Sequence, residues 1–444
     1  MEAERAQGYP FIARAGAKPL VIARTEGVYL IAADGRKILD AAGGAIVANI
    51  GHGRREVAEA FARASSEATY VVPPFATESR VRLVERLRER WLPAGINRAM
   101  FTSGGSESMD AAIRLARQHH VSAGRTGRWK VIGRDLSYHG ATLATLAIGG
   151  HSKRRAGFEP WLASLPKAPA CYCLRCPLGK KYPSCEIACA TDLERIIAHE
   201  GAETIAAFVA EPVVGSTGGA VAPVAEYWPA IVDICRRHGI LIIADEVMTG
   251  FGRTGKRFAV EHWGVAPDIL VGGKGLTGGY APMGGLFARE EVIEPIAASG
   301  DELMFFTYGG HPASCAAAEA VLDILERERL VERAAIMGAK LERALRERLG
   351  GHPHVADIRG RVLLLGVELV RDRATLDPFP LEAHATAKVV AAGLALGTFF
   401  YPGGCDPARD VITLGPPFIL EDEHVAQIVD HLHQAIDGAV ARLS

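Results

Sequence analysis

A lysine between two glycines and an aspartate at the end of an apolar run are the residues whose types and positions point most directly to chemistry. Lys274 follows the apolar run 269–271 with a glycine on each side, and Asp245 follows the apolar run 240–244. Small neighbours let a planar ligand approach the amine, and apolar surroundings lower the pKa of an amine toward the reactive free base. Such a lysine forms a Schiff base with an aldehyde cofactor such as pyridoxal phosphate, whose pyridine nitrogen a nearby carboxylate keeps protonated. We assign these two roles to Lys274 and Asp245.

Taken singly, neither residue identifies a site. Most lysines are solvated surface groups, and aspartates are common at strand ends and helix caps. The surrounding elements change this, because apolar runs typical of strands alternate with amphipathic stretches typical of helices from about residue 100 to 310. This pattern predicts an α/β fold with a largely parallel sheet.

One unit of the pattern relates the candidate residues to each other. The run 207–210 leads to Glu211, a helical stretch follows over 227–238, and the next strand ends at Asp245, which is a βαβ unit. Right-handed crossovers place the carboxyl ends of parallel strands on one edge of the sheet. We therefore expect Glu211, Asp245 and Lys274 to meet at the edge where ligands bind in open α/β sheets.

The flanks of this region carry shorter strand and helix patterns, which we interpret as one smaller domain made from both termini. We predict that residues 1–65 form the N-terminal part of the small domain, 66–315 the large cofactor-binding domain, and 316–444 the C-terminal part of the small domain.

Two further motifs complete a site for a phosphorylated, planar cofactor. Ser103-Gly104-Gly105-Ser106 precedes a helical stretch, so its amides and hydroxyls are placed to bind a phosphate at the positive end of a helix. The alternative is a plain Ser/Gly helix cap. Tyr138 offers an aromatic face on which a ring can stack.

Composition excludes several function classes. The 444 residues are 49% hydrophobic and 23% charged, and 50 basic against 51 acidic residues give a formal net charge of -1. This balance gives no electrostatic reason to expect nucleic acid or an anionic membrane as a partner. The N-terminus lacks the apolar core of a signal peptide, and no run approaches the ~18 apolar residues of a membrane span. We expect a cytoplasmic enzyme that acts on small molecules.

Five of the eight cysteines fall between Cys171 and Cys189. The spacing Cys173-x2-Cys176-x8-Cys185-x3-Cys189 suits a structural zinc or a labile disulfide. The alternative is a set of free thiols packed beneath a surface loop in a reducing compartment. We assign no metal to the reaction.

The motifs together resemble those of the class III aminotransferases, which belong to the fold type I pyridoxal phosphate enzymes. The resemblance covers nearly the whole chain and implies a mostly parallel seven-stranded sheet flanked by helices. Its matching pieces, in chain order, are Ser103-Gly104-Gly105-Ser106-Glu107, Tyr138-His139-Gly140, Glu211-Pro212-Val213, Asp245-Glu246-Val247, Gly250-Phe251-Gly252-Arg253, Gly273-Lys274-Gly275, Thr307-Tyr308-Gly309-Gly310-His311-Pro312 and Pro416-Pro417-Phe418.

The resemblance also implies residue roles. Lys274 carries the cofactor covalently, Tyr138 and Val247 cover the two faces of its ring, and Thr307 reaches the phosphate in the neighbouring subunit of a homodimer with shared active sites. Lys274, Asp245 and Tyr138 are thus the catalytic candidates. The cofactor-binding candidates are Gly105, Ser106, Tyr138, His139, Glu211, Asp245, Val247, Lys274 and Thr307.

The expected reaction is ping-pong transamination from an amine, ω-amino acid or β-amino acid to a 2-oxo acid such as pyruvate. Relatives whose substrates carry an α-carboxylate resemble one another in having an arginine that binds it, shortly before the Pro-Pro pair. This chain has Thr413 at that position. Arg409 could bind a substrate carboxylate instead, or be an exposed loop arginine paired with a nearby aspartate. The other candidate substrate contacts are Tyr70, Phe75 and Trp161.

Some alternative functions use the same cofactor, and others do not. Racemases, aminomutases and decarboxylases of the same fold use the same lysine chemistry, and a non-catalytic scaffold that only binds pyridoxal phosphate is a remote alternative. Gly250-x-Gly252-x-x-Gly255 matches the fingerprint of an NAD-dependent dehydrogenase. However, five residues separate these glycines from the preceding strand, which argues against a dinucleotide site.

Overall fold

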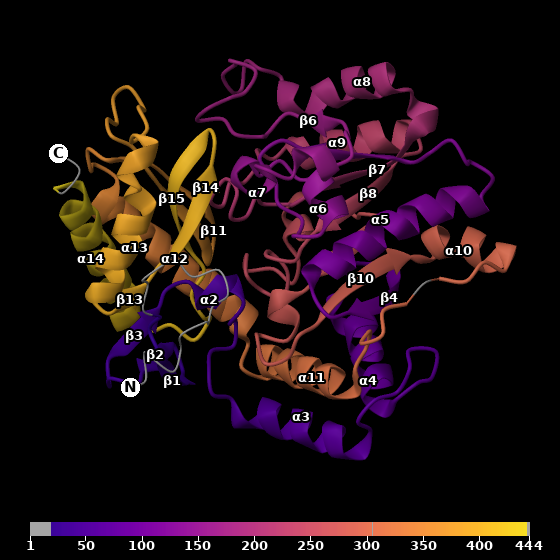
Figure 1. Cartoon of the computed structure of the whole chain (residues 1–444), viewed down its shortest axis with the longest axis horizontal. Helices are drawn as coiled ribbons and strands as arrows, with labels where there is room; N and C mark the ends of the chain where they lie inside the picture. The colour runs from indigo at the N-terminus through magenta and orange to yellow at the C-terminus, as the bar shows by residue number, and fades with distance from the viewer. Residues whose placement is uncertain (1–18, 304, 442–444) are drawn as a thin grey trace.

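The computed structural model describes residues 19–303 and 305–441, whose strands form three sheets (Figure 1). The largest sheet has seven strands in the order β4-β10-β9-β8-β7-β5-β6. Pairing is parallel from β9 to β6, whereas β10 runs antiparallel to both of its neighbours. The expected seven-stranded, mostly parallel sheet is confirmed. Its strands are β4 (Ile96–Thr102), β5 (Lys130–Arg134), β6 (Lys167–Ala168), β7 (Ile205–Ala210), β8 (Leu241–Asp245), β9 (Ile269–Gly272) and β10 (Gly284–Arg289).

Helices cover both faces of this sheet, so its central strands are apolar on both sides. All six residues of β7 are buried. Ala207 and Val209 belong to the core shared with α5, whereas Phe208 and Ala210 belong to the core shared with α8 and α9. This alternation is the two-residue period of a strand. The helices of the large-sheet region are α3 (Arg55–Glu67), α4 (Glu78–Arg86), α5 (Gly105–Ser122), α6 (Leu143–Ile148), α7 (Ser152–Arg155), α8 (Ala188–Glu200), α9 (Tyr227–Arg237), α10 (Glu290–Ser299) and α11 (Pro312–Arg327).

The register of the parallel strands aligns their carboxyl ends. Ala210 of β7 pairs with Ala244 of β8, and Asp245 pairs with Val271 of β9. The residues that follow these strands therefore leave the sheet at one edge, as the βαβ pattern predicted.

Two four-stranded sheets lie beside the large one, on the side where Figure 1 shows both ends of the described chain. In the first, β13 pairs in parallel with β3, so N-terminal and C-terminal segments share one sheet. The predicted domain boundaries stay a prediction. The elements are β1 (Ile22–Glu26), β2 (Tyr29–Ala32), β3 (Lys37–Asp40) and β13 (Thr398–Phe399), then β11 (Val355–Arg361), β12 (Leu364–Leu369), β14 (Tyr401–Cys405) and β15 (Ala408–Leu414), with helices α2 (Gly43–Ile46), α12 (Leu330–Leu349), α13 (Ala385–Ala395) and α14 (Asp422–Val440). Among the described residues, no helix combines the length and apolar character needed to cross a membrane.

A buried carboxylate joins the large-sheet region to the sheet that contains β12. Glu368 of β12 is 1% exposed and accepts hydrogen bonds from Arg359 (2.6 Å), Arg175 (2.9 Å) and the hydroxyl of Tyr172. Arg359 also donates to the carbonyl oxygen of Gly219 at 2.9 Å. The two regions therefore share one network of buried charges, in which each charge depends on its partner.

Glu368→Ala is expected to destabilise the protein by about 3–5 kcal/mol, because the guanidinium of Arg359 loses its buried partner and keeps only the partly exposed Asp357, at 3.2 Å. The measurement is the free energy of unfolding in urea. Glu342→Ala is the matched control, because Glu342 pairs with Arg346 at 2.8 Å on the surface of α12. Removing such a surface pair changes stability by about 1 kcal/mol or less. Equal effects of the two substitutions would contradict a structural role for the buried network.

Candidate active site at the carboxyl edge of the large sheet

The carboxyl edge of the large sheet borders a cavity of about 350 Å³. Most of its lining comes from the residues at or just after the ends of β4, β5, β7, β8 and β9. The structure thus brings together eight of the nine predicted cofactor-binding residues, namely Gly105, Ser106, Tyr138, His139, Glu211, Asp245, Val247 and Lys274.

Lys274 lies in a strained turn just after β9. Its φ of 41° falls in the left-handed region, which a residue with a side chain rarely adopts and which is common at functional sites. Burial lowers the pKa of its amine to about 8, although the charges of Asp245 and Glu211 act in the opposite direction. The structure therefore holds an amine that is partly in its nucleophilic form near neutral pH.

Packing explains the glycine that follows this lysine. A Cβ atom at Gly275 would lie 3.0 Å from the side-chain nitrogen of Asn49 and 3.1 Å from Cβ of Phe251. Asn49 also donates a hydrogen bond to the carbonyl oxygen of Gly275 at 2.9 Å. Gly275 thus lets the N-terminal segment hold the lysine turn in place. By contrast, a Cβ atom at Gly273 would be in ordinary contact with Val247, at 3.5 Å.

Asp245 is held by two hydrogen bonds. Its Oδ2 lies 2.7 Å from Nδ1 of His139, and its Oδ1 accepts from the backbone N–H of Val247 at 3.1 Å. Both side chains are buried, and Nε2 of His139 has no hydrogen-bond partner among the described residues. The pair fixes the orientation of the carboxylate at the cavity wall. His139, predicted to bind the cofactor, contacts Asp245 directly.

Glu211 links two loops at the cavity. Its carboxylate accepts hydrogen bonds from the backbone N–H groups of Gly215 (2.9 Å) and Tyr138 (3.3 Å). Burial raises the pKa of this carboxyl group. Its carbonyl oxygen accepts from the buried guanidinium of Arg134 at 2.8 Å. The contact with Glu211 thus fixes the backbone of Tyr138 beside the cavity.

The first turn of α5 provides a site for an anionic group. No side chain caps this helix at its N-cap, Gly104, so amides of its first turn are available to a ligand. Ser106 Oγ accepts a hydrogen bond from the backbone N–H of Ala141 at 3.1 Å. A Cβ atom at Gly105 would lie 3.0 Å from Val247, so a glycine is needed for this close approach.

These residues fit a phosphorylated aldehyde cofactor. The set contains an amine with a lowered pKa, a hydrogen-bonded carboxylate, an aromatic ring and an uncapped helix N-terminus. Sequence reasoning missed eight further lining residues, among them Ser216, Met248 and Thr277. They lie on loops, and no motif in the sequence marks them.

Other predicted site residues lie outside this cavity. Thr307 is exposed on the loop that precedes α11. Tyr70, Phe75 and Trp161 are also exposed, Phe75 to 67% and Trp161 to 72%. Arg409 lines a neighbouring cavity. The roles of these five residues stay predictions.

The cysteine-rich segment contains free thiols. Cys171 is buried, Cys173 is exposed, and all eight cysteines lack a disulfide partner. Within residues 19–303 and 305–441, the group of side chains with metal-ligand spacing lies elsewhere, at His352, His433 and Asp437.

Comparison with known proteins agrees with this arrangement along the chain. A sequence model of the family described as aminotransferase class-III matches residues 11–436. An uncharacterized aminotransferase of Schizosaccharomyces pombe is 37% identical over 98% of this chain and 96% of its own length. The putrescine–pyruvate aminotransferase of Pseudomonas aeruginosa is 32% identical over 95% of this chain and 91% of its own length.

A solved structure is similar over the same extent. It is that of a thermostable (S)-enantioselective omega-transaminase from Thermomicrobium roseum, with a TM-score of 0.91 and 37% identity over 100% of this chain and 98% of that one. The eight residues gathered at the sheet edge and the match along the chain lead to one conclusion. The protein belongs to the class III aminotransferases, a family of pyridoxal phosphate enzymes.

Proposed function

We propose that this enzyme transfers an amino group from an amine, ω-amino acid or β-amino acid to a 2-oxo acid such as pyruvate, with ping-pong kinetics and pyridoxal phosphate as cofactor. The observation that carries the proposal is Lys274, an amine with a lowered pKa that shares one cavity with the Asp245–His139 pair. The uncapped start of α5 supplies the phosphate site. A cytoplasmic location remains the expectation from the sequence.

Different residues of the chain have different roles in the proposed reaction. Bound pyridoxal phosphate acts as an electron sink for the bond that breaks at the substrate carbon. Lys274 would hold the cofactor and, as a free amine, would move the proton at the substrate carbon. Asp245, fixed by His139, keeps the ring nitrogen protonated. Tyr138 and Val247, which line the same cavity, would orient the ring.

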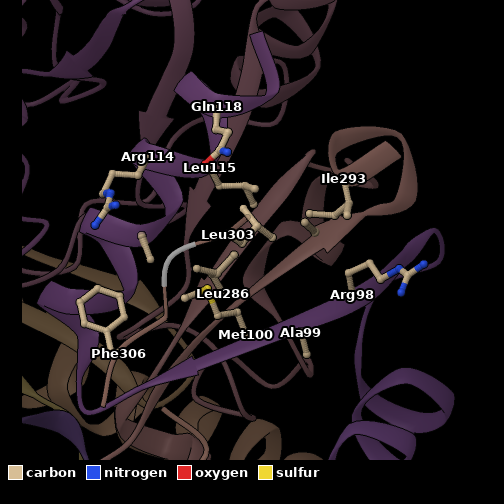
Figure 2. A pocket seen from close by; sticks show the side chains of 12 residues that line it. Arg98, Ala99, Met100, Arg114, Leu115, Gln118, Leu286, Ile293, Leu303 and Phe306 are labelled. Carbon is tan, nitrogen blue, oxygen red and sulfur yellow. The ribbon is translucent and has the colours of Figure 1, made fainter. Parts of the chain in front are cut away.

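A homodimer with shared active sites is part of the proposal. Thr307 lies outside the cofactor cavity of its own subunit, on a segment that exposes the apolar side chains of Leu303, Phe305 and Tyr308. Figure 2 shows Leu303 at an apolar pocket of about 220 Å³, together with Leu286 of β10. Exposed apolar side chains grouped in this way mark protein interaction surfaces. A second copy of the chain that covers this segment would bring Thr307 toward the neighbouring phosphate site.

The attachment of pyridoxal phosphate to the apoprotein is expected to follow the free amine of Lys274. Its rate rises with pH up to about 8 and then levels off, because the pKa of the amine is lowered from 10.5 to about 8. Nα-acetyl-lysine is the control, and its rate continues to rise toward pH ~10.4. Borohydride trapping at timed intervals, followed by peptide mass spectrometry, measures both rates and locates the link. A link at another lysine would contradict the assignment.

The lowered pKa of Lys274 also determines whether the protein gains or loses stability as the pH rises. The folded pKa lies below the unfolded one, so the unfolded chain binds more protons between pH 8 and 10.5. The apoprotein should therefore gain stability as pH rises through this window. Lys274→Met, which removes the titrating amine, should flatten that part of the profile.

The two half-reactions are expected to occur separately. An amine or ω-amino acid added without an acceptor should bleach the visible band of the bound cofactor, and pyruvate should restore it. Lys274→Ala is the control, because it retains the cofactor site without the proton-moving amine. Loss of optical purity of the donor without an acceptor would indicate a racemase, and release of carbon dioxide a decarboxylase. Absence of a cofactor band after addition of pyridoxal phosphate would refute the proposal as a whole.

A further inference from the structure

A second cavity of about 460 Å³ lies next to the cofactor cavity, and Ser216 lines both. The second cavity lies between α7 and the segments 380–387 and 402–410. Its lining is rich in cationic and titratable nitrogen groups, since it includes Lys153, Arg154, Arg409, His151 and His384 against the single carboxylate of Asp410. A substrate that enters the cofactor cavity past Ser216 would place its far end among these groups.

The position where related enzymes have a carboxylate-binding arginine is closed in this chain. Thr413 is fully buried, and its hydroxyl has no hydrogen-bond partner among the described residues. A Cβ atom at Gly403 would lie 2.5 Å from Thr413 Oγ1, so the backbone of β14 packs directly against this side chain. A substrate carboxylate must therefore be bound by a different group.

Two of the three cations in the second cavity already have partners. The guanidinium of Arg409 donates to the carbonyl oxygen of Phe379 at 2.8 Å and lies 3.6 Å from Asp406. The ammonium of Lys153 donates to the carbonyl oxygens of Gly404 (3.1 Å) and Arg409 (3.2 Å). Both side chains hold the segment around residues 404–409 in place. Arg409 is thus engaged with Phe379 and Asp406.

Arg154 differs from these two cations. Its guanidinium carbon lies 4.5 Å from the ring centroid of Tyr138, in a cation–π contact. Within residues 19–303 and 305–441, no carboxylate lies within ion-pair distance of Arg154. The side chain is exposed, and its charge contributes to the lowered pKa of Lys274. Stacking on Tyr138 holds the guanidinium near the path to the cofactor while its N–H donors remain available to a ligand.

We propose that Arg154 anchors an anionic group, a carboxylate or a sulfonate, at the end of the substrate opposite the reacting amine. The preferred donors are then ω-amino acids or ω-aminosulfonates whose amine reaches Lys274 while the anionic group pairs with the guanidinium of Arg154. A planar guanidinium binds such oxyanions through two parallel N–H···O bonds. Tyr138 contacts both the cofactor ring, in the proposed function, and this anchor. The inference rests on that function and adds the substrate class.

The test compares each ω-aminoalkanoate with the alkylamine of equal chain length. Arg154→Gln is expected to lower the ratio of kcat/KM for acid over amine by about 10–100-fold, mainly through KM, since a hydrogen bond to a charged group is lost. Arg154→Lys should restore part of the ratio, because it keeps the charge without the planar fork. An ω-aminosulfonate series shows which of the two anions is preferred.

Arg409→Gln is the matched variant, because Arg409 lies in the same cavity but is engaged with Phe379 and Asp406. Loss of the acid-over-amine ratio in Arg409→Gln with no loss in Arg154→Gln would overturn the proposal in favour of Arg409. An equal fall of kcat/KM for acids and amines in Arg154→Gln would also overturn it, since the side chain would then act only through Tyr138.

Binding of an unreactive dicarboxylate separates this inference from the proposed function. Adipate titrated calorimetrically into the holoenzyme is expected to bind about 10-fold or more weakly to Arg154→Gln than to the unaltered protein. Unchanged adipate affinity would count against the anchor. If no donor bleaches the cofactor band, the transaminase proposal fails, while the adipate titration still decides whether Arg154 binds anions.

Discussion

Burial of opposite charges at one edge of the large sheet is the constraint on which the active site depends. Lys274, Asp245 and Glu211 follow three neighbouring strands that are apolar on both faces. Desolvation disfavours the charged form of each group, so it lowers the pKa of Lys274 and raises the pKa of Glu211. The site remains stable because each carboxylate is satisfied locally, Asp245 by His139 and Glu211 by two backbone amides. The same desolvation that costs folding energy gives a lysine that is nucleophilic near neutral pH.

Close packing determines how these charges face the cavity. Val247 lies against Gly105, so the strand that ends in Asp245 contacts the helix start that is suited to phosphate. Gly403 lies against Thr413 and the carbonyl oxygen of Ser216 in the same manner. In both places a side chain on the glycine would press against the neighbouring residue.

The sequence predicted the parts of the site that depend on strand order. Parallel strands end on one edge, so Glu211 and Asp245 could be placed together without coordinates, and the structure brings them there. The antiparallel direction of β10 and the contribution of Ser216 depend on loop paths, which no periodicity encodes. Trp161 and Phe75 are candidates by residue type alone, and both lie exposed outside the cavity. The glycines of the apparent dinucleotide fingerprint pack against side chains, since a Cβ atom at Gly252 would lie 2.7 Å from Phe418.

Arg154 shows why substrate preference is harder to predict from sequence than reaction chemistry. The chemistry needs groups at strand ends, whose positions follow from the fold. The anchor for the far end of the substrate needs only a cation at the right distance, and the chain offers three in one cavity. They can be distinguished only by their partners, because Arg409 and Lys153 are bonded to carbonyl oxygens while Arg154 is stacked on Tyr138. If Tyr138 stacks on the cofactor as proposed, the contact between its ring and Arg154 would couple the reaction centre to substrate recognition through one residue.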